Sequence, residues 1–249
     1  MKKERVKPKA ASRESEANLR RRLADACNVL AMAGQGDDVW GHVSVRPPGA
    51  STFWMKPAGL GLEEVKPEDM ILVDLNGQVV RGKRPRHSEV FIHSEAYRAR
   101  PEVCAVVHTH PVHCCAFASI GVPLRPITHD GIFFSPPDVP RFSETTDLIV
   151  TPERGQAVAR TLGGRPALFL ISHGIVAVGT TVEEAAVHAL LLDKSARAQL
   201  LVPGGVPREY TTDEEARAKR ERLAGVQSAD IRWPYLLRTL ARWKRRQRA

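Results

Sequence analysis

Hydrophobic residues recur at the spacing of an amphipathic helix in several long stretches of this chain. Between residues 15 and 33, apolar side chains return every three or four positions until Gly34 ends the pattern. A similar stretch covers 182–201, where Thr181 can cap the first turn and acidic residues follow it. The same spacing predicts further helices over 88–100, 112–120, 152–162 and 231–248.

Shorter apolar runs bounded by turn residues predict strands between these helices. Asn76-Gly77 separates two such runs and is a strong signal for a two-residue hairpin. The predicted strands cover 43–46, 52–56, 70–75, 78–81, 103–107, 167–171 and 175–178. A chain of 249 residues with this mixture of elements can bury its core as a single α/β domain.

The formal net charge of +9 is unevenly distributed along the chain. Residues 1–13 carry +5 and residues 232–249 carry +7, which leaves the remainder mildly acidic. A nucleic-acid binder would spread basic residues over a folded face, so we expect no nucleic-acid partner. We expect a disordered basic arm at 1–13, a globular domain at 14–229 and a basic amphipathic helix at 230–249. The Trp-Leu stripe of that helix is expected to pack on its own chain or on a neighbouring subunit.

Cysteine usage and hydropathy favour a cytoplasmic location. No apolar stretch approaches the length of a membrane span, and the N-terminus lacks the apolar segment of a signal peptide. The four cysteines form no C-x-x-C pair and indicate no structural disulfide; they are Cys27, Cys104, Cys114 and Cys115.

Three histidines follow or end apolar runs and point to a metal site. His108 and His110 close the run 103–107, and side chains two positions apart on a strand share a face. His173 stands where the run 167–171 gives way to Gly174. Neutral imidazoles are common ligands of divalent metals, so these three residues predict a metal enzyme.

Several segments resemble the class II aldolase/adducin superfamily, in order and spacing, from about Leu19 to Pro203. The matching segments are Gly41-His42-Val43-Ser44-Val45-Arg46, Lys56-Pro57-Ala58-Gly59, Val73-Asp74-Leu75-Asn76-Gly77, His87-Ser88-Glu89 with His93, Tyr97-Arg98-Ala99-Arg100-Pro101, Val106-Val107-His108-Thr109-His110-Pro111 and Ser172-His173-Gly174.

This resemblance implies an α/β fold with a mixed β-sheet flanked by helices, assembled as a homotetramer with active sites between subunits. It makes 14–229 the catalytic domain. It also implies one catalytic divalent metal per chain, held by His108, His110 and His173, with zinc, manganese, iron and cobalt all suitable. Glu89 falls on the family's acid/base glutamate, which can also reach the metal. Adducin-type members lack these ligands, so an enzyme is favoured over a non-catalytic interaction protein.

Three departures from the sugar-phosphate aldolases favour a different substrate. His42, Ala58 and His87 stand where those members use an asparagine and hydroxyls for the phosphate. The pattern resembles the family's decarboxylase branch, which acts on hydroxylated aromatic carboxylates such as dihydroxyphthalate-type compounds. The leading hypothesis is therefore a metal-dependent carbon–carbon lyase that decarboxylates such an acid. A sugar-phosphate aldolase or epimerase is the alternative.

The remaining candidates follow from the needs of a carboxylate substrate. Proton transfer can involve the histidines near the motifs as well as Glu89; these are His42, His87 and His129. Cationic and small residues beside the motifs can bind the substrate; these are Lys56, Arg86, Ser88 and Gly41. His93 and His113 are expected to pack or to orient the metal ligands.

Overall fold

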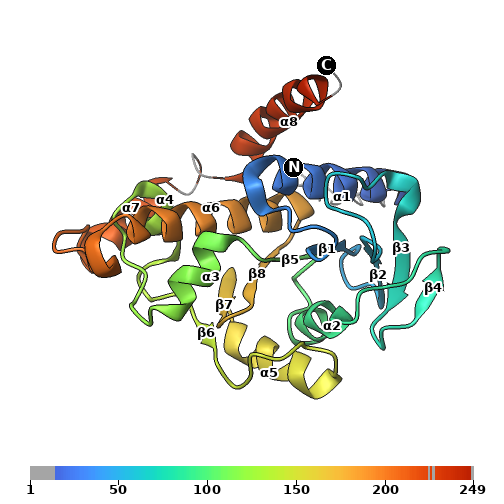
Figure 1. Ribbon diagram of the computed structural model, residues 1–249, viewed down its shortest axis with the longest axis horizontal. Coiled ribbons are helices and arrows are strands. Elements are labelled where there is room, and N and C mark those ends of the chain that lie inside the picture. The colour runs from blue at the N-terminus through green and yellow to red at the C-terminus, as the bar shows by residue number, and fades with distance from the viewer. Residues whose placement is uncertain (1–14, 224, 226–227, 248–249) are drawn as a thin grey trace, which may run out of the picture.

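The computed structural model describes residues 15–223, 225 and 228–247 and contains one eight-stranded sheet covered by helices (Figure 1). The helices are α1 (Glu16–Leu30), α2 (Val90–Ala99), α3 (Val112–Ser119), α4 (His129–Phe134), α5 (Pro152–Leu162), α6 (Val182–Leu200), α7 (Asp213–Leu223) and α8 (Ala229–Arg246). The strands are β1 (His42–Val45), β2 (Thr52–Met55), β3 (Ile71–Asp74), β4 (Val79–Arg81), β5 (Ala105–Thr109), β6 (Arg141–Phe142), β7 (Ala167–Leu170) and β8 (Gly174–Gly179). The predicted basic arm at 1–13 lies outside the described residues.

The sheet is mixed, as expected, with the strand order β4-β3-β2-β1-β5-β8-β7-β6. All neighbouring strands are antiparallel except β6 and β7, which are parallel. The central strand β5 pairs with β1 on one side and β8 on the other, although these three strands are far apart in sequence. The register places His42 of β1 opposite His108 of β5.

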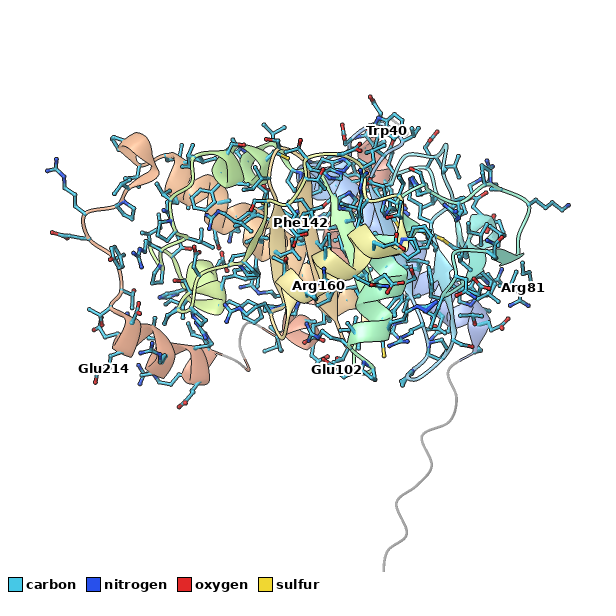
Figure 2. The ribbon with its side chains drawn as sticks, turned by 90° about the horizontal axis from the view of Figure 1, so that it is seen from below. Trp40, Arg81, Glu102, Phe142, Arg160 and Glu214 are labelled. Carbon is cyan, nitrogen blue, oxygen red and sulfur yellow. The ribbon has the colours of Figure 1, made fainter. Side chains whose placement is uncertain are left out.

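The two faces of the sheet are covered by different helices. One face packs against α1, α3 and α6, and Val43, Val45 and Val107 belong to that larger core. The other face packs against α2 and α5, as Figure 2 shows from below. Because side chains alternate along a strand, His42, Ser44 and His108 lie on the α2 side of the sheet.

Three of these α-helices and strands were absent from the sequence prediction. They are α4, α7 and the two-residue strand β6. Helix α4 and strand β6 lie in a proline-rich stretch, where helical or alternating periodicity cannot be recognised. Helix α7 is polar on nearly all sides, and only Ala216 of it is buried. The C-terminal helix α8 forms as predicted, and its Trp233 and Leu240 are buried in the core beside α1 and α6.

Candidate metal centre

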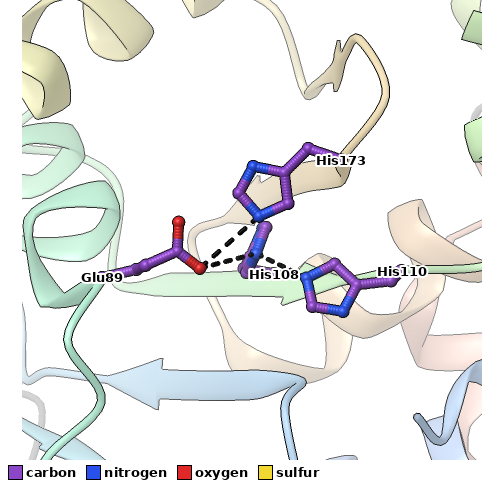
Figure 3. Close-up of side chains that lie close together, drawn as sticks. All are labelled: Glu89, His108, His110 and His173. Carbon is purple, nitrogen blue, oxygen red and sulfur yellow. Dashed lines mark hydrogen bonds and ion pairs between the residues drawn. The ribbon is translucent and has the colours of Figure 1, made fainter. Parts of the chain in front are cut away.

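Four side chains from separate parts of the chain converge on the α2 side of the sheet (Figure 3). They are Glu89 before α2, His108 in β5, His110 just after β5, and His173 in the turn between β7 and β8. One donor atom from each side chain lies within 4.8 Å of all the others. Glu89 Oε2 is 3.7 Å from His108 Nε2 and 3.5 Å from His173 Nε2, and the Nε2 atoms of His108 and His110 are 3.0 Å apart.

Local structure fixes where each of these side chains can point. Buried Gln35 accepts a hydrogen bond from Thr109 Oγ1 at 2.9 Å and thereby holds the end of β5 between the two histidines. Glu89 precedes the first turn of α2, and its Oε1 accepts the backbone N–H of Ile149 at 2.8 Å. These contacts leave the second carboxylate oxygen of Glu89 facing the histidines.

The turn that carries His173 needs both unusual backbone geometry and a glycine. Ser172 has a φ of 55°, in the left-handed region that few non-glycine residues adopt. A Cβ on Gly174 would lie 2.5 Å from the Thr109 carbonyl oxygen and 2.7 Å from His110 Cδ2. Gly174 therefore permits the close approach of β8 to the end of β5, which brings His173 to the other ligands.

Hydrogen bonds determine which ring nitrogens are free to bind a cation. His108 Nδ1 lies 2.9 Å from the Ile175 carbonyl oxygen, and His110 Nδ1 lies 2.8 Å from Asp37 Oδ2. Both partners are acceptors, so each Nδ1 carries the hydrogen and each neutral ring keeps a lone pair on Nε2. The two Nε2 atoms are 3.0 Å apart, so their lone pairs repel each other unless both bind the same cation. The donor set of three imidazoles and one carboxylate therefore fits a divalent metal ion.

The electrostatics of the cluster agree with this arrangement. Burial raises the pKa of Glu89, but the neighbouring His108 and His173 imidazoles outweigh burial and hold that pKa well below its usual range. Burial and the neighbouring His108 lower the pKa of His110 to about 4. At neutral pH the carboxylate is therefore ionised and the His110 ring is neutral, which are the forms that ligate metals.

Further histidines and one lysine form a wall beside the four ligands. The His42 ring centre is 4.8 Å from that of His108 and 4.5 Å from that of His87. His87 Nε2 lies 3.2 Å from Lys56 Nζ, which also donates to the Val39 carbonyl oxygen at 2.9 Å. Burial, together with Lys56, lowers the pKa of His87 to about 3. The structure thus brings His42, His87 and Lys56 to the predicted site.

Four other predicted site residues do not belong to the ligand cluster or to the histidines and lysine beside it. The Arg86 guanidinium donates to the carbonyl oxygens of Gly77 and His87 and so braces the loop before α2. Ser88 is exposed, and Gly41 is buried beside the His108 carbonyl. His129 is exposed at the start of α4, which packs on α6 and α7 away from α2 (Figure 1). The roles given to these four residues remain predictions.

Sequence reasoning missed two parts of the site. Asp37 orients His110 through the hydrogen bond described above, and nothing in its loop indicates this contact. Ser44 and Tyr97 join His93 in a buried hydrogen-bond chain that ends on His42. The four-residue spacing of Glu89, His93 and Tyr97 places all three on one side of α2 and is the signal that could have revealed it. His113 instead pairs with Asp193 of α6 at 3.4 Å.

Comparison with known proteins agrees with this fold. The sequence-family model of the class II aldolase and adducin N-terminal domain matches residues 21–200 of this chain. The chain is 36% identical over 220 residues to decarboxylase NovR of Streptomyces niveus, which covers 86% of this chain and 78% of that protein. It is 35% identical over 215 residues to 4-hydroxy-3-prenylphenylpyruvate oxygenase/4-hydroxy-3-prenylbenzoate synthase of Streptomyces roseochromogenus subsp. oscitans, covering 84% of this chain and 77% of that protein.

Among solved structures, L-fuculose 1-phosphate aldolase from Glaciozyma antarctica PI12 superimposes with a TM-score of 0.82 at 28% identity, covering 95% of both chains. Fold and site together define a lyase scaffold with room for a metal centre. The chain belongs to the class II aldolase and adducin family, as its motifs predict.

Proposed function

We propose that this protein is a divalent-metal-dependent carboxy-lyase that decarboxylates a hydroxylated aromatic carboxylate. Its relatives include one named as a decarboxylase and one whose name contains hydroxylated aromatic acids. The chain keeps a complete set of ligands, Glu89, His108, His110 and His173, in a geometry that suits a metal. Imidazoles stand at the two positions, 42 and 87, where the resemblance to sugar-phosphate aldolases would place phosphate-binding groups.

The observation that carries the substrate class is the buried charge of Lys56. Its side chain is 0% exposed, and among the described residues no carboxylate oxygen lies within 4.0 Å of Nζ. A buried ammonium with no carboxylate in contact is costly, and burial lowers the pKa of Lys56 to about 8 although the more distant Glu63 and Glu64 act to raise it. An anionic ligand bound beside His87 supplies the missing negative charge. A carboxylate on a flat aromatic ring suits this wall of imidazoles.

In the proposed reaction the bond between a ring carbon and the carboxylate carbon breaks and carbon dioxide leaves. The ring carbon takes up one proton before this bond breaks, while the neighbouring hydroxyl loses its proton and becomes a ring carbonyl. The electron pair of the broken bond then restores the aromatic ring, and the carbonyl oxygen becomes a phenolate. A bound divalent ion supplies Lewis acidity that stabilises negative charge on oxygen. Lys56, fully buried behind His87, attracts the substrate anion through its charge, and the ionised Glu89 completes the ligand set and accepts or returns protons. His42 and His87 are the other groups close enough to take part.

The proposal is tested with zinc-, manganese-, iron- and cobalt-loaded protein and a panel of carboxyl-labelled hydroxybenzoates and dihydroxyphthalates. We expect release of labelled carbon dioxide without oxygen, and its loss in a His108→Ala/His110→Ala variant. L-fuculose 1-phosphate belongs in the same panel because the fold closely matches an aldolase for it. Cleavage of the sugar phosphate with no carbon dioxide release from any aromatic acid would replace the carboxy-lyase by an aldolase.

We further propose that the active sites lie between subunits of a homotetramer in a reducing, cytoplasmic environment. Trp40 and Val112 flank the site in sequence and are 60% and 78% exposed, and Figure 2 shows Trp40 at the rim of the molecule. All four cysteines are free thiols, and no described helix is long and apolar enough to cross a bilayer. Light scattering of the wild type and of Trp40→Lys tests the assembly, and a wild-type monomer would refute it.

A further inference from the structure

A continuous chain of buried hydrogen bonds runs from the last turn of α2 to the edge of the metal centre. Tyr97 Oη is 2.7 Å from Ser44 Oγ, and Ser44 Oγ is 2.7 Å from His93 Nδ1. His93 Nε2 is in turn 2.6 Å from His42 Nδ1. All four side chains are at most 2% exposed. Two of the residues come from β1 and two from α2, so the chain joins the sheet to the helix.

The number of hydrogens available decides the direction of these bonds. Four neutral groups contribute one hydrogen each, and the chain contains three bonds. If His42 donated to His93, His93 to Ser44 and Ser44 to Tyr97, the hydrogen of the buried Tyr97 hydroxyl would have no acceptor among these four groups. Ser44 Oγ is the acceptor that the described residues offer to Tyr97. The phenol therefore donates to Ser44, Ser44 donates to His93 Nδ1, and His93 Nε2–H donates to His42 Nδ1.

We propose that Tyr97, Ser44 and His93 are positioning residues that hold neutral His42 in the tautomer with its hydrogen on Nε2. His42 then offers a fixed N–H donor to an anionic ligand beside the metal centre. The identity of that ligand as a hydroxylated aromatic carboxylate rests on the proposed function above. The direction of the hydrogen bonds does not.

The surroundings support the neutral state and the fixed direction. Burial is the largest cause lowering the pKa of His42 and of His93 well below the usual value, and the other histidines and Lys56 act in the same sense on His42. Burial also raises the pKa of Tyr97, so the phenol keeps its hydrogen. The Arg46 guanidinium lies 4.5 Å from the Tyr97 ring centre and Phe53 lies 5.2 Å from it, which fixes the donor end of the chain.

This assignment separates two kinds of histidine within one cluster. His108 and His110 carry hydrogen on Nδ1 and present lone pairs on Nε2, as metal ligands do. His42 lies directly opposite His108 in the sheet, but the hydrogen on its Nε2 prevents that nitrogen from binding a cation. The same residue type thus serves as ligand in β5 and as donor in β1. A neutral imidazole that donates through N–H to a developing oxyanion is an established electrostatic device.

Long-range proton–nitrogen NMR correlations of the zinc-loaded full-length protein with isotope-labelled histidine read the tautomers directly. We expect His42 and His93 as Nε2–H forms and His108 and His110 as Nδ1–H forms, each assigned by a single His→Gln variant. Finding His42 as the Nδ1–H form in the wild-type protein would overturn the proposal, whatever reaction the protein catalyses.

Variants that remove the Ser44 and Tyr97 hydroxyl groups test whether the hydrogen-bond chain sets the His42 tautomer. In Tyr97→Phe the acceptor that the described part of the chain offers to the Ser44 hydroxyl is still His93 Nδ1, so the His42 tautomer is expected to persist. In Ser44→Ala/Tyr97→Phe neither hydroxyl remains, and we expect a mixture of both His42 tautomers. Ser44→Ala alone provides the same comparison if the double variant does not fold. An unchanged His42 spectrum after removal of Ser44 and Tyr97 hydroxyls would show that the chain does not set the tautomer.

Binding of salicylate to the zinc-loaded protein tests the donor itself. A hydrogen bond to a charged group corresponds to a factor of about ten or more in affinity, so His42→Leu should weaken binding by at least about tenfold. His42→Gln keeps an N–H donor and should lose much less. Equal salicylate affinity of wild type and His42→Leu would overturn the donor role. If wild type does not bind salicylate while NMR shows the expected tautomers, the proposed substrate class fails and the tautomer assignment stands.

Discussion

Asp37 is half-exposed, and its influence on the site passes through a single hydrogen bond to His110 Nδ1. A carboxylate at that position keeps the hydrogen on Nδ1 and increases the basicity of Nε2. We expect Asp37→Asn to weaken divalent metal binding by about 10–100-fold without unfolding the protein. Competition with a metal-sensitive chelator measures this. Asp38→Asn is the matched control, because its side chain is also exposed and asparagine tolerates its positive φ of 44°. Similar losses in both variants would refute the specific role of Asp37.

Lys56 is expected to act in opposite directions on two properties. Its buried charge lowers the free energy of unfolding but favours binding of the anionic substrate. Lys56→Met should leave the free energy of unfolding at neutral pH unchanged or raise it by up to about 3 kcal/mol. The folded pKa of about 8 lies below the usual 10.5, so the unfolded chain binds more protons between these values. Wild-type stability should therefore rise relative to the methionine variant as pH increases from about 8 to 10.5.

The same variant should raise KM for the carboxylate substrate by about tenfold, because the positive charge behind His87 no longer attracts the substrate anion. Denaturant titrations and steady-state kinetics measure the two effects, with exposed Lys83→Met as the control. A Lys56→Met enzyme with wild-type KM would remove Lys56 from the binding site.

At the scale of elements, the turn between β7 and β8 links packing to ligand geometry. Gly174→Ala should destabilise the fold by about 1–3 kcal/mol, because the new methyl group meets backbone atoms that cannot move aside. It should also weaken metal binding, since the nearest side chain is the ligand His110. Gly164→Ala is the control because nothing lies within 4 Å of its added Cβ. Thermal unfolding and metal titration of both variants check this, and wild-type metal affinity in Gly174→Ala would contradict it.

Periodicity explains which elements were predictable from sequence. Helices α1 and α5 have one regular apolar face, and strands β5, β7 and β8 are short runs buried at every position, so these elements follow from spacing and length. The ligands were predictable because His108 and His110 share one strand end and His173 ends another run. Asp37 and Ser44 were not predictable, because their contacts depend on how a loop and β1 are placed against residues distant in sequence.

At the scale of the whole molecule, buried neutral histidines determine the response to acid. The pKa of His110 is about 4 and that of His87 about 3 in the folded chain, against an ordinary value of 6.5. Below pH 6.5 the unfolded chain binds more protons than the folded chain. The contribution of these neutral histidines to the free energy of unfolding is therefore fully present above that pH. It should fall as pH decreases from 6.5 to about 3, by up to about 1.4 kcal/mol per histidine and pH unit. Denaturant midpoints of chelator-treated protein that do not change with pH in this range would contradict this.

The order of the strands also has a consequence for how a metal ion enters the protein. The four ligands span residues 89–173, and they meet only after β8 has paired with β5. An early folding species that contains β5 alone offers two imidazoles, which hold a divalent ion weakly. Tight metal binding must therefore follow the pairing of β5 with β8. The rate of metal uptake by a refolding chain then reports how fast the strand pairings most distant in sequence form.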